Sequence, residues 1–148
     1  MDTELCFTIA NLSVLPVWLL LAIAPRCRVT HLVADSCAIP LLLAVAYVTL
    51  LVMVVASGAA LDFSSLEAVA ALFQDERALL VGWIHYLAFD LFIGTWIVRD
   101  AQRVGIWHLV VLPCLLFTLM LGPTGLLLYF IVRWVRGEYV VPRGAMTA

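Results

Sequence analysis

Long apolar segments constrain this chain more than any other feature of its sequence. A helix needs roughly 20 apolar residues to cross the ~30 Å hydrocarbon core of a bilayer, and several stretches of the chain meet that requirement. Of the 148 residues, 66% are hydrophobic and 12% are charged, whereas about 25% of a typical soluble domain is charged. The sequence therefore predicts an all-α, polytopic membrane protein that forms a single transmembrane domain over residues 1–148.

Four apolar segments are expected to be transmembrane helices, at about residues 6–24, 38–60, 79–98 and 107–135. The fourth is too long for one straight crossing, because at 1.5 Å per residue it would measure about 43 Å. The tetrapeptide Gly122-Pro123-Thr124-Gly125 interrupts it. We therefore expect a kinked or broken fourth helix whose second part emerges into the membrane interface.

Residues 61–73, between the second and third spans, have the pattern of a short interfacial helix. Ser64 and Glu67 fit a capping box in which Ser64 is the N-cap, and apolar residues recur at helical spacing around them. A capped loop helix without a role of its own fits the same pattern. A short polar turn is expected at 99–105, between the third and fourth spans.

Arginine counts do not orient these four spans. All the basic residues are arginine. One side of the membrane would carry Arg77, Arg133, Arg136 and Arg143, and the other side would carry Arg26, Arg28, Arg99 and Arg103. The positive-inside rule, which assigns the side richer in basic residues to the cytoplasm, therefore returns a tie.

Charge and cysteine patterns argue against several other classes of protein. The net charge is −2 and no basic stretch could follow a nucleic-acid backbone, so nucleic acid is not an expected partner. The four cysteines form no CxxC pair, so neither a zinc site nor a dithiol redox motif is expected. The first apolar segment has no basic leader and no cleavage pattern, so we expect a retained helix.

The third span carries the polar residues of greatest interest. Asp90 lies near its middle, where an ionised side chain costs ~2.5–3.5 kcal/mol on insertion scales, so it should face the interior of the bundle. Removal from water favours the neutral acid, which can donate a proton. Trp83, Tyr86 and Asp90 are spaced i, i+3, i+7 and share one helix face, whereas His85 lies about 140° away from Asp90 around the helix.

Each candidate residue also has a purely structural interpretation. Thr118 is expected at about the depth of Asp90 on the antiparallel fourth span, where a hydrogen bond between the two would only hold the helices together. A structural hydrogen bond is as good a role for His85 as catalysis, and His108 fits an interfacial position. Arg133 is expected to be a snorkelling anchor, and an Asp100–Arg103 pair would contribute little.

The chain resembles a known family along the same residues. The motif Gly-Trp-Ile-His-Tyr-Leu-Ala-Phe-Asp-Leu-Phe-Ile-Gly at 82–94, with Trp-Ile-Val-Arg-Asp-Ala at 96–101 and Phe-Thr-Leu-Met-Leu-Gly-Pro-Thr-Gly-Leu at 117–126, resembles the abscisic-acid-deficient-type membrane proteins. The resemblance covers about residues 5–136. The plant member is required to make neoxanthin from violaxanthin and carries a plastid transit peptide, which we do not expect in this chain. The resemblance implies a bacterial-like member in the inner membrane, with a lipid-soluble carotenoid and membrane lipids as its partners.

Together, the residues and the resemblance predict a cofactor-free isomerase that acts on epoxy-carotenoids. Opening an epoxide to an allenic alcohol needs a proton delivered to the epoxide oxygen and another removed from the adjacent polyene carbon. Asp90 is the expected acid, and His85 or His108 the expected base. The expected substrate-binding residues are Trp83, Tyr86, Phe89 and Thr118.

Other functions fit the same residues. A non-enzymatic carotenoid-binding or assembly protein, acting as a homo-oligomer or beside a carotenoid-pathway enzyme, would use the same aromatic cavity. A proton or small-solute transporter would use Asp90 and His85 as a relay, although the other spans offer few polar residues for a water path. Haem ligation by His85 and His108 is less favoured, because the two belong near opposite ends of the membrane.

Overall fold

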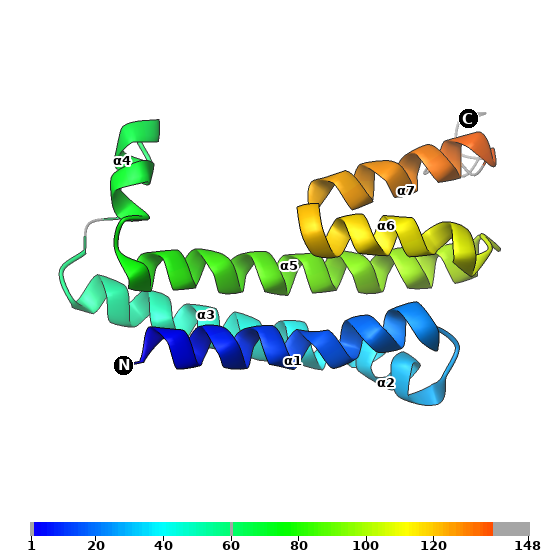
Figure 1. Ribbon diagram of the computed structural model, residues 1–148, viewed down its shortest axis with the longest axis horizontal. Helices are drawn as coiled ribbons and strands as arrows, with labels where there is room; N and C mark the ends of the chain where they lie inside the picture. Colours follow the sequence, from blue (N-terminus) through cyan, green and yellow to red (C-terminus); the bar gives the residue numbers. More distant parts are fainter. Residues whose placement is uncertain (1, 60, 138–148) are drawn as a thin grey trace, which may run out of the picture.

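The computed structural model describes residues 2–59 and 61–137, and the regular elements in this part of the chain are all helices (Figure 1). Three helical segments are long and apolar enough to cross a membrane. They are α1 (Thr3–Ile23), α3 (Ala38–Ala56) together with the preceding α2 (Arg28–Ser36), and α5 (Glu76–Arg103). The all-helical prediction is confirmed, and three of the four expected spans correspond to helices that are long and apolar enough to cross a membrane, whereas the fourth does not.

Helix α5 forms the centre of the bundle, with α1 and α3 on one side and the C-terminal helices on the other (Figure 1). Close packing against α1 depends on a glycine. A Cβ atom on Gly94 would lie 2.5 Å from the Trp18 ring of α1, so the indole fits only because this position has no side chain. The buried residues of α5 extend along its whole length, as expected of a helix that is covered on several faces.

The predicted polar turn at 99–105 is wrong for its first five residues, because α5 continues to Arg103. Asp75 starts the helix as N-cap, where its carboxylate accepts the backbone N–H groups of Arg77 and Ala78. At the other end, Asp100 and Ala101 are buried. Sequence alone suggested that the charged residues at 99–103 face water. In the structure they form a further turn of α5, and tertiary contacts bury part of that turn.

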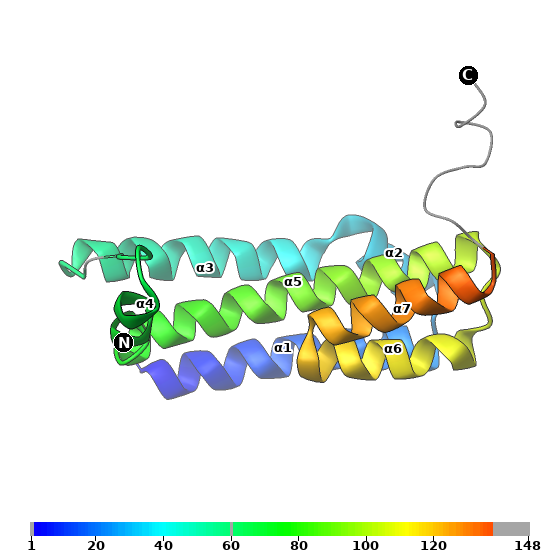
Figure 2. The same ribbon diagram turned by 90° about the horizontal axis from the view of Figure 1, so that it is seen from above.

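The fourth span is broken at 122–125 as expected, but the prediction of one kinked helix is wrong, because the chain reverses direction at Gly122. Helix α6 (His108–Leu121) and helix α7 (Pro123–Val135) pack against each other as a hairpin along one half of α5 (Figures 1 and 2). With 14 and 13 residues, each is about 20 Å long, too short for ~30 Å of hydrocarbon. The hairpin therefore enters from one end of the bundle and returns to the same end.

Two glycines explain why this turn is a reversal and not a kink. Gly122 has φ +46° and ψ −99°, a conformation that residues with a side chain rarely adopt, and Pro123 fixes the first residue of α7. A side chain on Gly125 would collide with the backbone of Thr118 and Cys114. The two helices can therefore approach at backbone distance immediately after the turn.

The short helix expected between the second and third spans is α4 (Leu66–Leu72), and it begins one residue later than predicted. Its N-cap is Ser65, whose hydroxyl accepts the N–H of Ala68 at 3.1 Å. Ser64 is instead held outside the helix, because its N–H donates to Asp62 at 2.8 Å. Helix α4 has no buried residue and runs across the direction of α5 (Figure 1), an orientation suited to a helix at the membrane interface.

Candidate functional site

Asp90 lies halfway along α5, against the tip of the α6–α7 hairpin. A Cβ atom on Gly122 would lie 2.9 Å from Asp90 Oδ1, so the turn touches the carboxyl group. Asp90 is half-buried, and its Oδ2 atom is shielded from solvent without a hydrogen-bond partner among the described residues. Buried polar atoms normally have a partner, and the side chain beside this carboxyl group is that of Tyr86.

Tyr86 lies beside Asp90, one helical turn earlier on the same side of α5. Its hydroxyl donates to the carbonyl oxygen of Leu119, at 3.4 Å, near the end of α6. The tip of the hairpin thus contacts both polar residues on this face. Because Gly122 is also the N-cap of α7, the positive end of that helix dipole faces the Asp90 carboxyl group.

A strip of aromatic rings leads away from this point toward the N-terminal end of α1. The ring centroids of Tyr86 and Trp83 are 5.5 Å apart, and those of Trp83 and Phe7 are also 5.5 Å apart. The indole N–H of Trp83 donates to Asn11 Oδ1 at 3.2 Å, which joins α5 to α1. We call Phe7, Trp83 and Tyr86 the aromatic strip, and its inner end is Asp90.

The outer end of the aromatic strip opens into a cavity of about 510 Å³ between α1 and α5. Its lining combines aromatic and aliphatic side chains with two carboxylates: Thr3, Glu4, Phe7, Glu76, Leu79, Leu80 and Trp83. The Thr3 hydroxyl donates to Glu76 Oε2 at 3.4 Å across its mouth. The cavity therefore has a polar entrance and an apolar aromatic wall, and the aromatic strip continues from Trp83 through Tyr86 to Asp90, which does not line the cavity.

His85 and Phe89 lie on a different side of α5 from this strip. The two rings meet edge to face, with centroids 4.7 Å apart, and His85 also contacts Tyr47 of α3, with centroids 5.6 Å apart. Both side chains are exposed at the molecular surface. The structure thus brings together Asp90, Tyr86 and Trp83, but it does not bring His85 or Phe89 to them.

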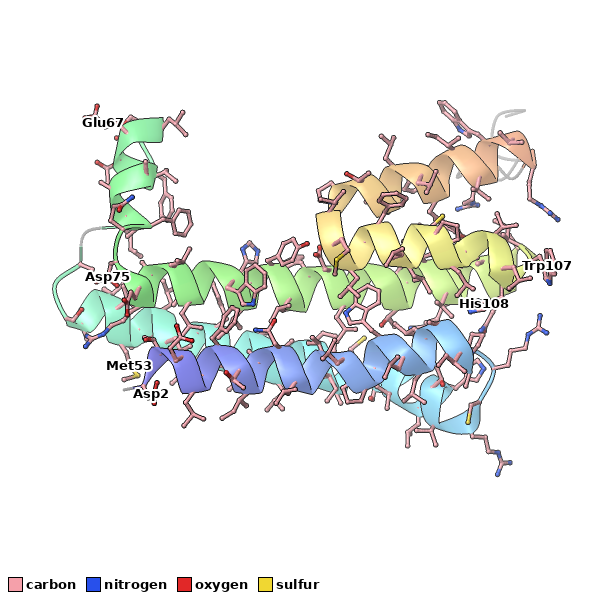
Figure 3. All side chains as sticks on the ribbon, in the orientation of Figure 1. Asp2, Met53, Glu67, Asp75, Trp107 and His108 are labelled. Atoms are coloured by element: carbon pink, nitrogen blue, oxygen red, sulfur yellow. The ribbon has the colours of Figure 1, made fainter. Side chains whose placement is uncertain are left out.

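Thr118 and His108 are also separated from Asp90. Thr118 is fully buried, and its hydroxyl donates to the carbonyl oxygen of Cys114 at 2.8 Å, so the hydrogen bond expected between Thr118 and Asp90 is not formed. His108 lies at the end of the bundle where α6 begins (Figure 3), and its Nε2 is 2.8 Å from the Ala22 carbonyl oxygen. No three His, Cys, Asp or Glu side chains within residues 2–59 and 61–137 are grouped to hold a metal ion.

A second polar cluster, which sequence reasoning missed, joins α5 to α7. Arg133 Nη1 lies 3.0 Å from Asp100 Oδ2, and the Tyr129 hydroxyl donates to the same oxygen at 2.7 Å. The expected Asp100–Arg103 pair is present at 2.8 Å. Arg133 is 4% exposed, so its expected role as a snorkelling anchor is wrong. The i, i+4 spacing of Tyr129 and Arg133 puts both side chains on one face of α7, but it indicates a contact with Asp100 only once α7 is known to fold back on α5.

Comparisons with known proteins agree on one relationship. A family model described as ABA DEFICIENT 4-like matches residues 5–129 of this chain. The chloroplastic protein ABA DEFICIENT 4 of Arabidopsis thaliana is 30% identical over 136 residues, and the match covers 86% of this chain and 60% of the relative. The chain thus spans less than two thirds of that relative's length. No solved structure matches the chain.

Proposed function

The chain belongs to the ABA DEFICIENT 4-like family, and from this membership we propose that it is a membrane protein of carotenoid metabolism that isomerises an epoxy-xanthophyll. One observation supports the chemical part of the proposal above all others. The buried Oδ2 atom of Asp90 has no partner in the described part of the chain, and it lies at the inner end of an aromatic strip. A rigid polyene lying along that strip would present its terminal ring to this oxygen.

Asp90 alone can supply both proton transfers of the isomerisation. The neutral carboxyl group gives its proton to the epoxide oxygen as one carbon–oxygen bond opens. The resulting carboxylate then takes the proton from the adjacent polyene carbon, whose C–H electron pair forms the second double bond of the allene. The oxygen remains as a hydroxyl group, and the carboxyl group ends neutral as it began, so no oxidant, reductant or second base is needed.

The surroundings of Asp90 suit this cycle. The transient carboxylate would lie at the N-terminus of α7, where negative charge is stabilised. Tyr86, held by the Leu119 carbonyl oxygen, would fix the position of the ring beside the acid. In this mechanism His85, on the α3 side of the helix, has no part.

The decisive experiment replaces Asp90 by asparagine. Asparagine keeps the shape of the side chain, so the hairpin tip should stay in place while the acid is lost. In liposomes supplied with an epoxy-xanthophyll, the purified Asp90→Asn protein should form product about 100-fold or more slowly than the parent protein. The exposed acid Asp62 offers a matched control, Asp62→Asn. Full product formation by a folded Asp90→Asn protein would eliminate the acid role.

A carotenoid carrier is the second candidate, and an apolar groove favours it. A recess of about 390 Å³ lies between α1 and α3 over Ile84, and its lining includes Ile9, Ala10, Leu42 and Ala46. Such a groove could hold a pigment without any chemistry. The same liposome assay separates the two functions, because a carrier would retain the pigment unchanged whereas an isomerase would release a new product.

A further inference from the structure

The two ends of the bundle carry opposite charge. One end, where α1 begins and α4 lies, is acidic, and Figure 3 marks Asp2, Glu67 and Asp75 there. Its charged residues are Asp2, Glu4, Asp62, Glu67, Asp75, Glu76 and a single arginine, Arg77. The opposite end holds the other six arginines of the described residues, Arg26, Arg28, Arg99, Arg103, Arg133 and Arg136, together with the two acids Asp35 and Asp100. We call these the acidic end and the basic end.

The hairpin is the cause of this asymmetry. If α6 and α7 formed one crossing, Arg133 and Arg136 would join Arg77 at the acidic end. Because the chain turns back at Gly122, α7 ends beside the C-terminal part of α5, and its arginines are added to the basic end. Arg133 is buried against Asp100, which still leaves five exposed arginines at the basic end and one at the acidic end.

An excess of arginine at one end of a membrane protein determines how the protein is oriented in the bilayer. Arginine and lysine close to the ends of spans are retained on the side where the chain is synthesised, whereas Asp and Glu contribute little to the choice. Anionic headgroups on the cytoplasmic leaflet also attract basic residues beside the membrane. The arginines at issue lie in short connections or in the last turns of α5 and α7, which are the positions where this rule applies.

We propose that the basic end faces the compartment in which the chain is made, in contact with anionic lipid headgroups, and that the acidic end faces the opposite compartment. The first residues of α1 then lie on the far side, and both ends of the hairpin lie on the near side. The cavity bounded by Glu4 and Glu76 opens toward the far side. This orientation depends on the charges and the hairpin, and not on any reaction at Asp90.

Thiol labelling tests the orientation in the intact protein. Cys27 is an exposed, free cysteine at the basic end, and Ser64 is an exposed position at the acidic end. One variant keeps Cys27 and carries Cys6→Ala and Cys37→Ala. A second carries the same changes with Cys27→Ala and Ser64→Cys. Buried Cys114 is kept in both.

A membrane-impermeant maleimide is added to right-side-out and to inside-out bacterial membrane vesicles, and detergent-solubilised protein shows that each thiol can react. We expect Cys27 to be labelled in inside-out vesicles and the S64C thiol in right-side-out vesicles, each with at least a tenfold preference. Labelling of Cys27 in right-side-out vesicles, or of each thiol equally in both preparations, would overturn the orientation. Labelling of both thiols from one side would overturn the three-crossing arrangement from which it follows.

A charge-altered protein tests whether the arginines are the cause. Arg26→Gln, Arg28→Gln and Arg136→Gln remove three exposed charges from the basic end. The fraction of Cys27 labelled in right-side-out vesicles should rise at least severalfold. An unchanged labelling pattern would show that the arginines do not set the orientation.

Discussion

Arg133 of α7 and Asp100 of α5 form a buried ion pair, with Arg133 Nη1 3.0 Å from Asp100 Oδ2 and side-chain exposures of 5% and 4%. The Tyr129 hydroxyl donates to the same carboxylate oxygen. The three groups tie the returning arm of the hairpin to the central helix.

Arg133→Met should strongly destabilise the protein. The change removes the buried partner of the Asp100 carboxylate and leaves it only the exposed Arg103, at 2.8 Å, as a counter-charge, and breaking a buried pair typically costs about 3–5 kcal/mol. Thermal unfolding in detergent micelles measures the loss. The neighbouring Arg136 is exposed, so Arg136→Met should change stability little. A melting temperature of Arg133→Met equal to that of the parent would show that the pair does not hold the hairpin.

Gly125→Ala should prevent close packing of the hairpin. The added methyl group meets the backbone of Thr118 and Cys114, and backbone cannot move aside as a flexible side chain can. Overpacking of this kind typically costs about 1–3 kcal/mol. The same unfolding assay applies, with Thr124→Ala as control because Thr124 is exposed in the same turn. Equal stability of the two variants would contradict the observed helix contact.

Gly122→Ala should impair turnover more than a comparable glycine change elsewhere. Its φ of +46° disfavours any side chain, and the new Cβ would lie 2.9 Å from Asp90 Oδ1, so the acid must shift. Gly58 also has a positive φ, of +88°, but nothing lies within 4 Å of its added Cβ. Gly58→Ala therefore reproduces the backbone strain without disturbing Asp90. Product formation per folded protein should fall for Gly122→Ala alone, and an equal effect of both changes would remove the link to Asp90.

His85→Gln should retain product formation within a fewfold of the parent rate. His85 packs on Phe89 and Tyr47, on another side of α5 from the aromatic strip, and the proposed cycle returns the proton through Asp90. The liposome assay with an epoxy-xanthophyll measures the effect. A loss as large as that of Asp90→Asn would restore His85 as the base and require the two residues to meet in a different arrangement.

The elements that sequence predicted well are those whose length and hydropathy suffice to define them. Helices α1, α3 and α5 are long apolar runs, and the spacing of Trp83, Tyr86 and Asp90 put them on one side of α5. Phe7 and Asn11 could not be added to this group, because nothing local in the sequence indicates that α1 lies beside that face.

The hairpin was beyond sequence reasoning for a related reason. A Gly-Pro step after an apolar helix fits a kink as well as a reversal. Distant contacts decide between them: Gly125 on Thr118, and Arg133 on Asp100. The same ion pair explains why α5 continues past Arg99, since it allows a charged residue to be buried in the last helical turns.

The hairpin accompanies α5 along only half of its length (Figures 1 and 2). In a bilayer, hydrocarbon tails of one leaflet would fill the space beside the uncovered half, directly against Trp83 and the tip of the turn. An oil-soluble molecule dissolved in that leaflet could then slide sideways to Asp90 without ever being exposed to water. Because the hairpin is only half as long as α5, Asp90 would be accessible laterally from the lipid bilayer.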